Sequence, residues 1–301
     1  MVLYSGGSGD KRGNNKKSRD TAATASNPPR EHDDSTPYLD STYSPIRIDA
    51  KSQINFGSHL ISIAPQKNRN ESVYRRFEAS KMAVEQLLSV SNDDYTISII
   101  PIPPVNTPSK ISDHVMIKFK MPIVIDAEGH LTKYCTMPIE LATIRMNKDS
   151  SHLPGIIDTF SVASTKYALY GEPHNGLITR FHQASLHDTL DEVDAKEFQE
   201  AKLEIALNNN TDTAIKVNRI VLPAAQMNFF YDTNDQSITG NDNNNHHTVY
   251  LEAIEMDIQS NMRAMISLLN RPPREPATPV PSISNLSERE RFEMKRGVLI
   301  A

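Results

Sequence analysis

Apolar and polar residues alternate along much of this chain with the two-residue period that is typical of β-strands. In HVMIKFKMPIVID every second residue is large and apolar, at Val115, Ile117, Phe119, Met121, Ile123 and Ile125. Successive side chains of a strand point to opposite faces, so this run predicts one long half-buried strand, with a bend or an edge position at Pro122. The turn sequence AEGH connects it to LTKYCTMPIELATIR, and together the two runs predict a β-hairpin.

A second predicted hairpin lies between residues 203 and 217. On either side of the turn sequence NNNTD, apolar residues alternate at Leu203, Ile205, Leu207, Ile215 and Val217. The apolar positions change parity near Asn218, which predicts a bulge or a crossing between sheets, and they shift again between Leu251 and Ile254. Shorter strands are predicted in IRIDA, NFGSHLISIA, YTISIIPI, GIIDTFSV and QMNFFYD.

Two segments do not read directly as strands. The apolar residues of VYRRFEASKMAVEQLL, residues 73–88, match one face of a helix, but the alternation in the first half also matches a strand, and both interpretations stay open. In NMRAMISLLN, residues 261–270, the apolar spacing predicts a short helix that ends before Pro272 and Pro273.

The distribution of these patterns predicts how the chain is organised. Residues 1–44 are polar and lack periodic apolar positions, so we expect a disordered arm. Residues 45–270 are expected to form one β-sandwich module, with two tandem sandwiches that divide near residue 155 as the alternative. Residues 271–301 are expected to be a proline-rich linker and tail. The predicted fold class is mainly β: a two-layer antiparallel β-sandwich with a disordered N-terminal arm and a proline-rich C-terminal tail.

Composition and charge argue against several classes of protein. The chain has 301 residues and a formal net charge of −5, which argues against general nucleic-acid binding, because phosphate contacts need a concentrated basic surface. Neither a membrane-spanning apolar run nor the apolar core of a secretory signal occurs in the sequence, so we expect no membrane insertion and a cytoplasmic location. A single cysteine, Cys135, excludes an internal disulfide framework and a zinc–thiolate site. We expect no cofactor.

The residues that could carry catalysis are scattered. Neither GxSxG nor GxxxxGK[ST] occurs, and Cys135 lies within a predicted strand. Imidazole and carboxylate groups suit zinc, manganese or iron, and one span contains His152, Asp158, Glu172, His174, His182, His187 and Asp188. Their spacing matches no compact metal motif. A metal-dependent hydrolase built from the His152 to His187 cluster, with His174, His182 and His187 as candidate ligands, is therefore the alternative hypothesis.

The run KYALYGEPHNGLITRF, residues 166–181, is the main candidate for a binding site. Two alternating segments flank GEPHNG and predict a hairpin, whose simplest register places Arg180 opposite Tyr167. A guanidinium, phenol groups and the N–H groups of a glycine-containing turn could hold an anion or carboxylate. The candidate ligand-binding residues are Tyr167, Tyr170, Gly171, Glu172, His174, Gly176 and Arg180. A Tyr–Arg stack that only stabilises the sheet would explain the same residues.

Three segments of the sequence carry a resemblance to a known family. They are IPIPPVNTPSKISDHVMIKFKMPIVID, KYALYGEPHNGLITRF and FEMKRG. They include a PxxPxNxP element from Pro101 to Pro108 and an LYGxPxxG element from Leu169 to Gly176. Over most of residues 46–301 the chain resembles an archaeal family known as domain of unknown function 432, which supplies no catalytic or ligand residues. The resemblance implies an archaeal origin and an accessory role at a membrane channel.

These observations favour a non-catalytic binding or regulatory module. Catalysis usually needs a poised nucleophile, an acid–base pair or a metal in a concave site, and the sequence shows none of the corresponding spacings. The expected partner is a protein that docks on an exposed sheet edge, or an anion held by Tyr167, Arg180 and the turn at residues 171–176.

Overall fold

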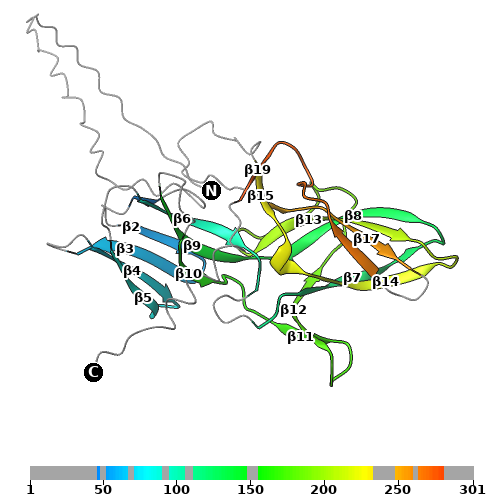
Figure 1. Ribbon diagram of the computed structural model, residues 1–301, viewed down its shortest axis with the longest axis horizontal. Helices are drawn as coiled ribbons and strands as arrows, with labels where there is room; N and C mark the ends of the chain where they lie inside the picture. The colour runs from blue at the N-terminus through cyan, green and yellow to red at the C-terminus, as the bar shows by residue number, and fades with distance from the viewer. Residues whose placement is uncertain are drawn as a thin grey trace, which may run out of the picture. The chain divides into compact units, whose positions relative to one another are not determined.

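The described part of the chain is built almost entirely from β-strands (Figure 1). The computed structural model describes residues 46–47, 52–66, 71–89, 95–105, 111–147, 155–232, 248–259 and 264–280. The strands form four sheets, and the described residues contain one helical element, the 3-10 turn η1 (Ala224–Gln226). The predicted arm at residues 1–44 and the last part of the predicted tail lie outside the described residues.

Two of the sheets, which we call sheets A and B, come mainly from the first half of the chain. Sheet A has the strand order β1 (Ile46–Arg47), β6 (Tyr95–Ile102), β9 (Glu140–Asn147) and β10 (Gly155–Phe160). Sheet B is a meander of β2 (Ser52–Phe56), β3 (His59–Pro65), β4 (Glu71–Glu78) and β5 (Lys81–Ser89). The segment at residues 73–88, open between helix and strand, is therefore most of the β4–β5 hairpin.

The other two sheets, C and D, contain most of the remaining strands. Sheet C has the order β11 (Tyr167–Tyr170), β12 (Leu177–Ala184), β7 (Val115–Ile125) and β14 (Ile215–Leu222). Sheet D has the order β18 (Ala264–Leu268), β17 (Ile254–Ile258), β13 (Glu200–Asn209), β16 (Val249–Leu251), β15 (Phe229–Asp232) and β19 (Ala277–Pro279). Strand β8 (His130–Pro138) also pairs with β13.

The predicted mainly β sandwich is confirmed. Most neighbouring strands are antiparallel, and the parallel pairs among the described strands are β12–β7, β13–β16 and β13–β17. One apolar core cluster includes residues from every sheet, among them Ile61, Ile99, Ile117 and Leu203. Because β7 and β8 precede residue 155 and pair with strands that follow it, each of sheets C and D joins distant parts of the chain. Whether residues 45–270 count as one module or two stays a prediction.

Both long hairpins predicted from the turn sequences are wrong. Strands β7 and β8 lie in different sheets, and so do β13 and β14. Instead, β7 pairs with β14 and β8 pairs with β13, so each turn carries the chain across from one sheet to the other. Alternation and a turn sequence are the same for a hairpin and for such an arch. The choice is made by pairing between distant segments, which no local pattern contains.

The buried amide of Asn209 holds the two arches together. Its Nδ2 donates to the backbone oxygens of Ile125 (3.2 Å), Asp126 (2.7 Å) and Thr213 (2.8 Å). The backbone N–H of Glu128 also donates to the oxygen of Thr211 at 3.0 Å. Backbone groups of both turns are thereby satisfied away from water, which explains why a fully buried asparagine follows an apolar strand.

Two further predictions concern irregular strands. The parity change at Asn218 is a bulge, because the β14–β7 register shifts between Val217 and Arg219. On β7 the same irregularity spans the residues between Lys118 and Ile123, which include Pro122, and β12 pairs with β7 only as far as Phe119. Pro122 therefore lies at a bend where neither neighbouring strand is paired with it, as the sequence predicts.

The predicted helix at residues 261–270 is wrong. Its described part contains β18, which pairs antiparallel with β17 from Ala264 to Leu268. Methionine, alanine and leucine favour helices locally, but here pairing with β17 outweighs that propensity. The shift between Leu251 and Ile254 separates β16 from β17.

Candidate functional site

The β11–β12 hairpin has the register that the sequence predicts. Tyr167 lies opposite Arg180, and Tyr170 lies opposite Leu177. Strand β12 pairs with β7 only from Arg180 to Ala184. The part of the hairpin before Arg180, which contains β11, the turn and the start of β12, is therefore a two-stranded ribbon. Figure 1 shows this ribbon projecting from the other strands of sheet C.

Large apolar side chains are exposed on both faces of the ribbon. Residues directly opposite each other share a face, so Tyr167, Leu169 and Ile178 lie on one face and Tyr170 and Leu177 on the other. These five side chains are between 38% and 49% exposed. They make up five of the eleven large apolar side chains that stand exposed in the described part of the chain. Scattered exposed apolar residues are normal, whereas these five are concentrated on one short ribbon.

The turn at residues 171–176 is closed by its own backbone. The oxygen of Glu172 accepts from the N–H groups of Asn175 (3.3 Å) and Gly176 (2.6 Å). Gly171 has φ +102°, and a Cβ on Gly176 would lie 2.5 Å from the oxygen of Glu172, so both positions require glycine. Two of the N–H groups that the sequence offered to an anion are thus used within the turn.

The side chain of Arg180 does not reach the ligand position that we expected for it. It is 3% exposed, and its Nη1 donates to Oε1 of Glu140, whose side chain is 2% exposed. Its Nη2 donates to Oγ of Ser161 at 2.8 Å. The Tyr–Arg stack in this region instead joins Arg219 to the ring of Tyr170, at 5.5 Å from the ring centroid. Arg180 therefore anchors the base of the hairpin to sheet A.

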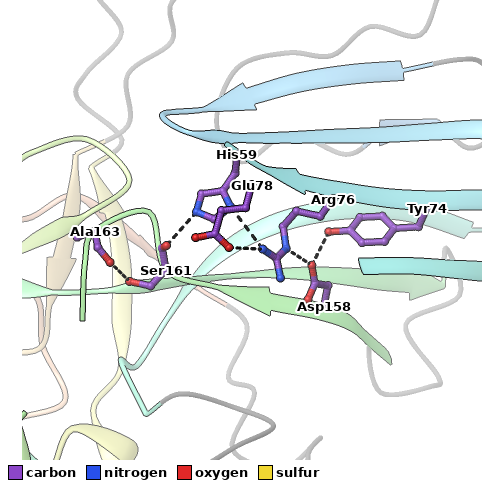
Figure 2. Close-up of polar contacts among 7 residues, drawn as sticks. All are labelled: His59, Tyr74, Arg76, Glu78, Asp158, Ser161 and Ala163. Atoms are coloured by element: carbon purple, nitrogen blue, oxygen red, sulfur yellow. Dashed lines mark hydrogen bonds and ion pairs between the residues drawn. The ribbon is translucent and has the colours of Figure 1, made fainter. Parts of the chain in front are cut away.

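A second buried polar group begins at the same serine. The backbone oxygen of Ser161 accepts from Nε2 of His59 at 3.1 Å, and its Oγ donates to the oxygen of Ala163 at 2.9 Å. Figure 2 shows Arg76 between His59 and Asp158, with Nε of Arg76 donating to Oδ2 of Asp158 at 2.5 Å. Polar contacts thus run without a break from the hairpin base through sheet A to sheet B.

Asp158 is the centre of this second group. Besides Arg76, it accepts a hydrogen bond of 2.9 Å from the hydroxyl of Tyr74, which also lies 3.2 Å from Oγ1 of Thr143. Tyr74 and Thr143 are fully buried. Burial and the nearby Asp158 raise the pKa of Tyr74, so it stays a neutral donor. A buried carboxylate with two such donors fixes strands β4, β9 and β10 relative to one another.

His59 is held as a neutral imidazole. Burial and the neighbouring Arg76 lower its pKa. Its Nδ1 lies 3.4 Å from Nη1 of Arg76, which is always a donor, so Nδ1 accepts and Nε2 carries the proton donated to Ser161. The ring also packs against Phe160, with centroids 5.1 Å apart. His59 thus has the geometry of a structural contact and not that of a poised base.

The described histidines of the alternative hypothesis have different partners. His182 Nε2 is 2.9 Å from Oγ1 of Thr136, His187 Nδ1 is 4.0 Å from Oε2 of Glu192, and His174 lies in the exposed hairpin turn. His152 is outside the described residues. Across the part of the chain that the structure describes, no three histidine, cysteine or acidic side chains are grouped so that they could hold a metal ion.

The pH dependence of stability tests the environment of His182. Burial, with Arg180 as the next cause, lowers its pKa from 6.5 to about 4. The stabilisation that depends on the neutral ring is complete above pH 6.5 and is lost as the pH falls toward 4. The free energy of unfolding should fall by about 3 kcal/mol in total from this cause. In urea titrations, we expect the free energy of unfolding of wild type to fall more steeply over this range than that of His182→Gln.

A matched variant at an exposed histidine controls for other titrating groups. His174→Gln removes an imidazole from the exposed hairpin turn and is measured in parallel as the reference for losing a histidine outside the core. Parallel profiles for wild type and His182→Gln would contradict the assigned environment.

Sequence reasoning missed the burial of these ionic residues as pairs, although the sequence contains a signal for it. Glu140 interrupts the apolar run TMPIELATI, and Arg180 shares its parity with the inward-facing Ala184. A lone charge at an inward position of a strand implies a buried partner, since burying an unpaired charge costs too much. The partner itself cannot be identified from the pattern.

Comparison with known proteins gives a family and no neighbour of known structure. The sequence model of a family described as "Protein of unknown function (DUF432)" matches residues 42–300. No curated protein and no solved structure matches the chain.

Proposed function

The chain belongs to this family of proteins of unknown function, and from that premise we propose that it is a non-catalytic binding module whose protein partner docks on the β11–β12 hairpin. The concentration of exposed apolar side chains on this ribbon carries the proposal. Burying such side chains against a partner yields about 25 cal/mol for each Å² of apolar surface removed from water. A regulatory role would follow from occupancy of this surface.

The exposure of both faces of the ribbon indicates how the partner binds. A flat partner covers one face only, whereas an added strand places alternate side chains on both faces. Arg180 N donates toward β7, to the oxygen of His114, whereas Phe181 N donates to the oxygen of Lys166. By the alternation of antiparallel pairing, the backbone groups of Leu169 point away from β12, toward the free side of β11. An extended segment that pairs beside Leu169 would contact both faces.

The base of the hairpin is suited to hold this surface in place. Arg180 ties β12 to Glu140 of β9, and Thr179 donates its hydroxyl to the oxygen of Ala168 across the ribbon at 3.0 Å. A surface that is fixed before binding loses less conformational entropy when its partner arrives.

Selection from a displayed library of random peptides on the full chain tests the proposal. We expect wild type to enrich apolar, extended peptides, whose binding is then measured by fluorescence anisotropy. Leu169→Thr with Ile178→Thr places residues of high strand propensity on the ribbon but removes apolar surface, so binding should weaken about tenfold or more. Met82→Thr with Leu87→Thr on β5 is the matched control, since these residues are 55% exposed, and it should bind like wild type. Equal binding by the hairpin variant, or no enrichment, would contradict the proposal.

Two finer features stay predictions. The family resemblance implies that the partner stands at a membrane channel and that the protein is archaeal. The described residues contain no helix long and apolar enough to cross a bilayer. A cytoplasmic location remains our expectation from the sequence.

A further inference from the structure

The charged residues of sheet C are all of one sign. Its four strands contain Lys118, Lys120, Arg180, Lys216 and Arg219, and no aspartate or glutamate. The chain as a whole carries a net charge of −5, so the sheet differs strongly from the rest of the molecule. A local field of this kind attracts anions even when the net charge of the protein is negative.

Four of these cations are exposed and have no carboxylate partner. Arg180 is the buried member, paired with Glu140. Within the described ranges, none of the other four lies within ion-pair distance of an acidic side chain. Lys118 and Arg219 are moreover direct cross-strand neighbours. Like charges opposite each other destabilise a sheet, so this pair is costly unless an anion neutralises it.

An exposed apolar side chain lies among the cations. Val124 is 61% exposed, lies opposite Lys216 and has the same strand parity as Lys118 and Lys120. Lys118 and Val124 lie opposite Arg219 and Lys216, which are three positions apart on β14, or roughly 10 Å along a strand. Val124 therefore lies among the cations on the face that β7 and β14 share, which we call the outer face of sheet C.

We propose that the outer face of sheet C binds the headgroup layer of an anionic lipid membrane. Dispersed cations suit a continuous layer of phosphate charge, and Val124 can enter the boundary between headgroups and acyl chains. A nucleic-acid site would instead need a row of stacking aromatic residues or a groove, and the nearby ring of Tyr170 is already stacked on Arg219. The binding is peripheral, through a sheet face.

This inference does not rest on the proposed function. The membrane surface involves cations on β7 and β14, and one of them, Arg219, stacks on Tyr170 of the hairpin. The docking-surface variants are therefore placed at Leu169 and Ile178, which lie on the other face of the ribbon. A variant at one surface should therefore lose one kind of binding and keep the other.

Co-sedimentation of the full chain with vesicles tests the proposal. The two probes are vesicles of phosphatidylcholine alone, and of phosphatidylcholine and phosphatidylglycerol in equal parts. We expect binding to the anionic vesicles only, and weaker binding as salt rises. At about tenfold for each 1.4 kcal/mol and about 1 kcal/mol for each cation, Lys118→Gln with Arg219→Gln should weaken binding about thirtyfold.

A double variant with the same change in net charge is the control. Lys81→Gln with Lys196→Gln removes two exposed cations outside sheet C and should bind nearly as wild type does. The hairpin variant Leu169→Thr with Ile178→Thr should also keep vesicle binding. No binding to anionic vesicles, equal binding to both vesicles, or an equal loss in the control would overturn the proposal. Salt-sensitive binding to polyglutamate or single-stranded DNA without vesicle binding would overturn it too.

Discussion

Arg180→Ala is expected to lower the free energy of unfolding by about 3–5 kcal/mol. The substitution removes the guanidinium that donates to Glu140 and Ser161, and it leaves a carboxyl group that is 2% exposed without this cation. The Coulomb energy of the pair is largely offset by desolvation, so the loss comes mainly from the charge that remains buried. Urea denaturation of the full chain at neutral pH measures the effect.

A double variant separates this mechanism from a general loss of packing. Arg180→Met with Glu140→Leu removes both charges and keeps apolar volume, so it should recover most of the stability lost in Arg180→Ala. A loss below about 1 kcal/mol in Arg180→Ala would show that water reaches Glu140, and it would contradict the buried ion pair.

Asp158→Ala should produce a loss of similar size, about 3–5 kcal/mol. It leaves Arg76, whose side chain is 10% exposed, without its partner at 2.5 Å, and it removes an acceptor from the hydroxyl of Tyr74. Tyr74→Phe, which removes only the hydroxyl, should cost about 1–2 kcal/mol. Urea denaturation of both variants, together with an Arg76 and Asp158 double-mutant cycle, gives the coupling energy.

The neighbouring position on β4 provides the matched control. Arg75 binds Glu85 at 2.8 Å, but these side chains are 38% and 45% exposed. Successive residues of a strand point to opposite faces, so Arg75 faces solvent while Arg76 faces Asp158. Arg75→Ala should therefore change stability by less than about 1 kcal/mol. Equal losses at the two arginines would contradict the assigned burial.

The local parts of the fold could be predicted from sequence. The register of Tyr167 with Arg180 follows from a short connection between two alternating segments, and the bulge at Asn218 follows from the parity change. Both features are determined by residues within a few positions of one another. Strand identity was equally predictable wherever the two-residue period was long, as between Val115 and Ile125.

The non-local parts could not be predicted in this way. Whether the turn after Ile125 closes a hairpin or an arch depends on the pairing of β7 with β14, about ninety residues later. The position of Arg180 at the hairpin base was correct, but its buried partner Glu140 comes from another sheet. Its role as an anchor, in place of the ligand-binding role that we expected, depends on that contact.

The charge distribution of sheet C lies between these cases. The absence of acidic residues from β7, β11, β12 and β14 is visible in the sequence once the strands are grouped. In the linear sequence these cations lie up to about a hundred positions apart, and acidic residues elsewhere in the chain balance their charge. The topology brings Lys118 and Arg219 together and makes the pattern visible.

Hydrogen–deuterium exchange tests the proposed docking surface most directly. The full chain is compared with and without the selected peptide that binds most tightly. Our account predicts slowed exchange at residues 167–170 and 177–178, with the amide of Leu169 among the most protected, because that amide points to the free side of β11. Protection that appears on β5 or another strand, with the hairpin unchanged, would contradict it.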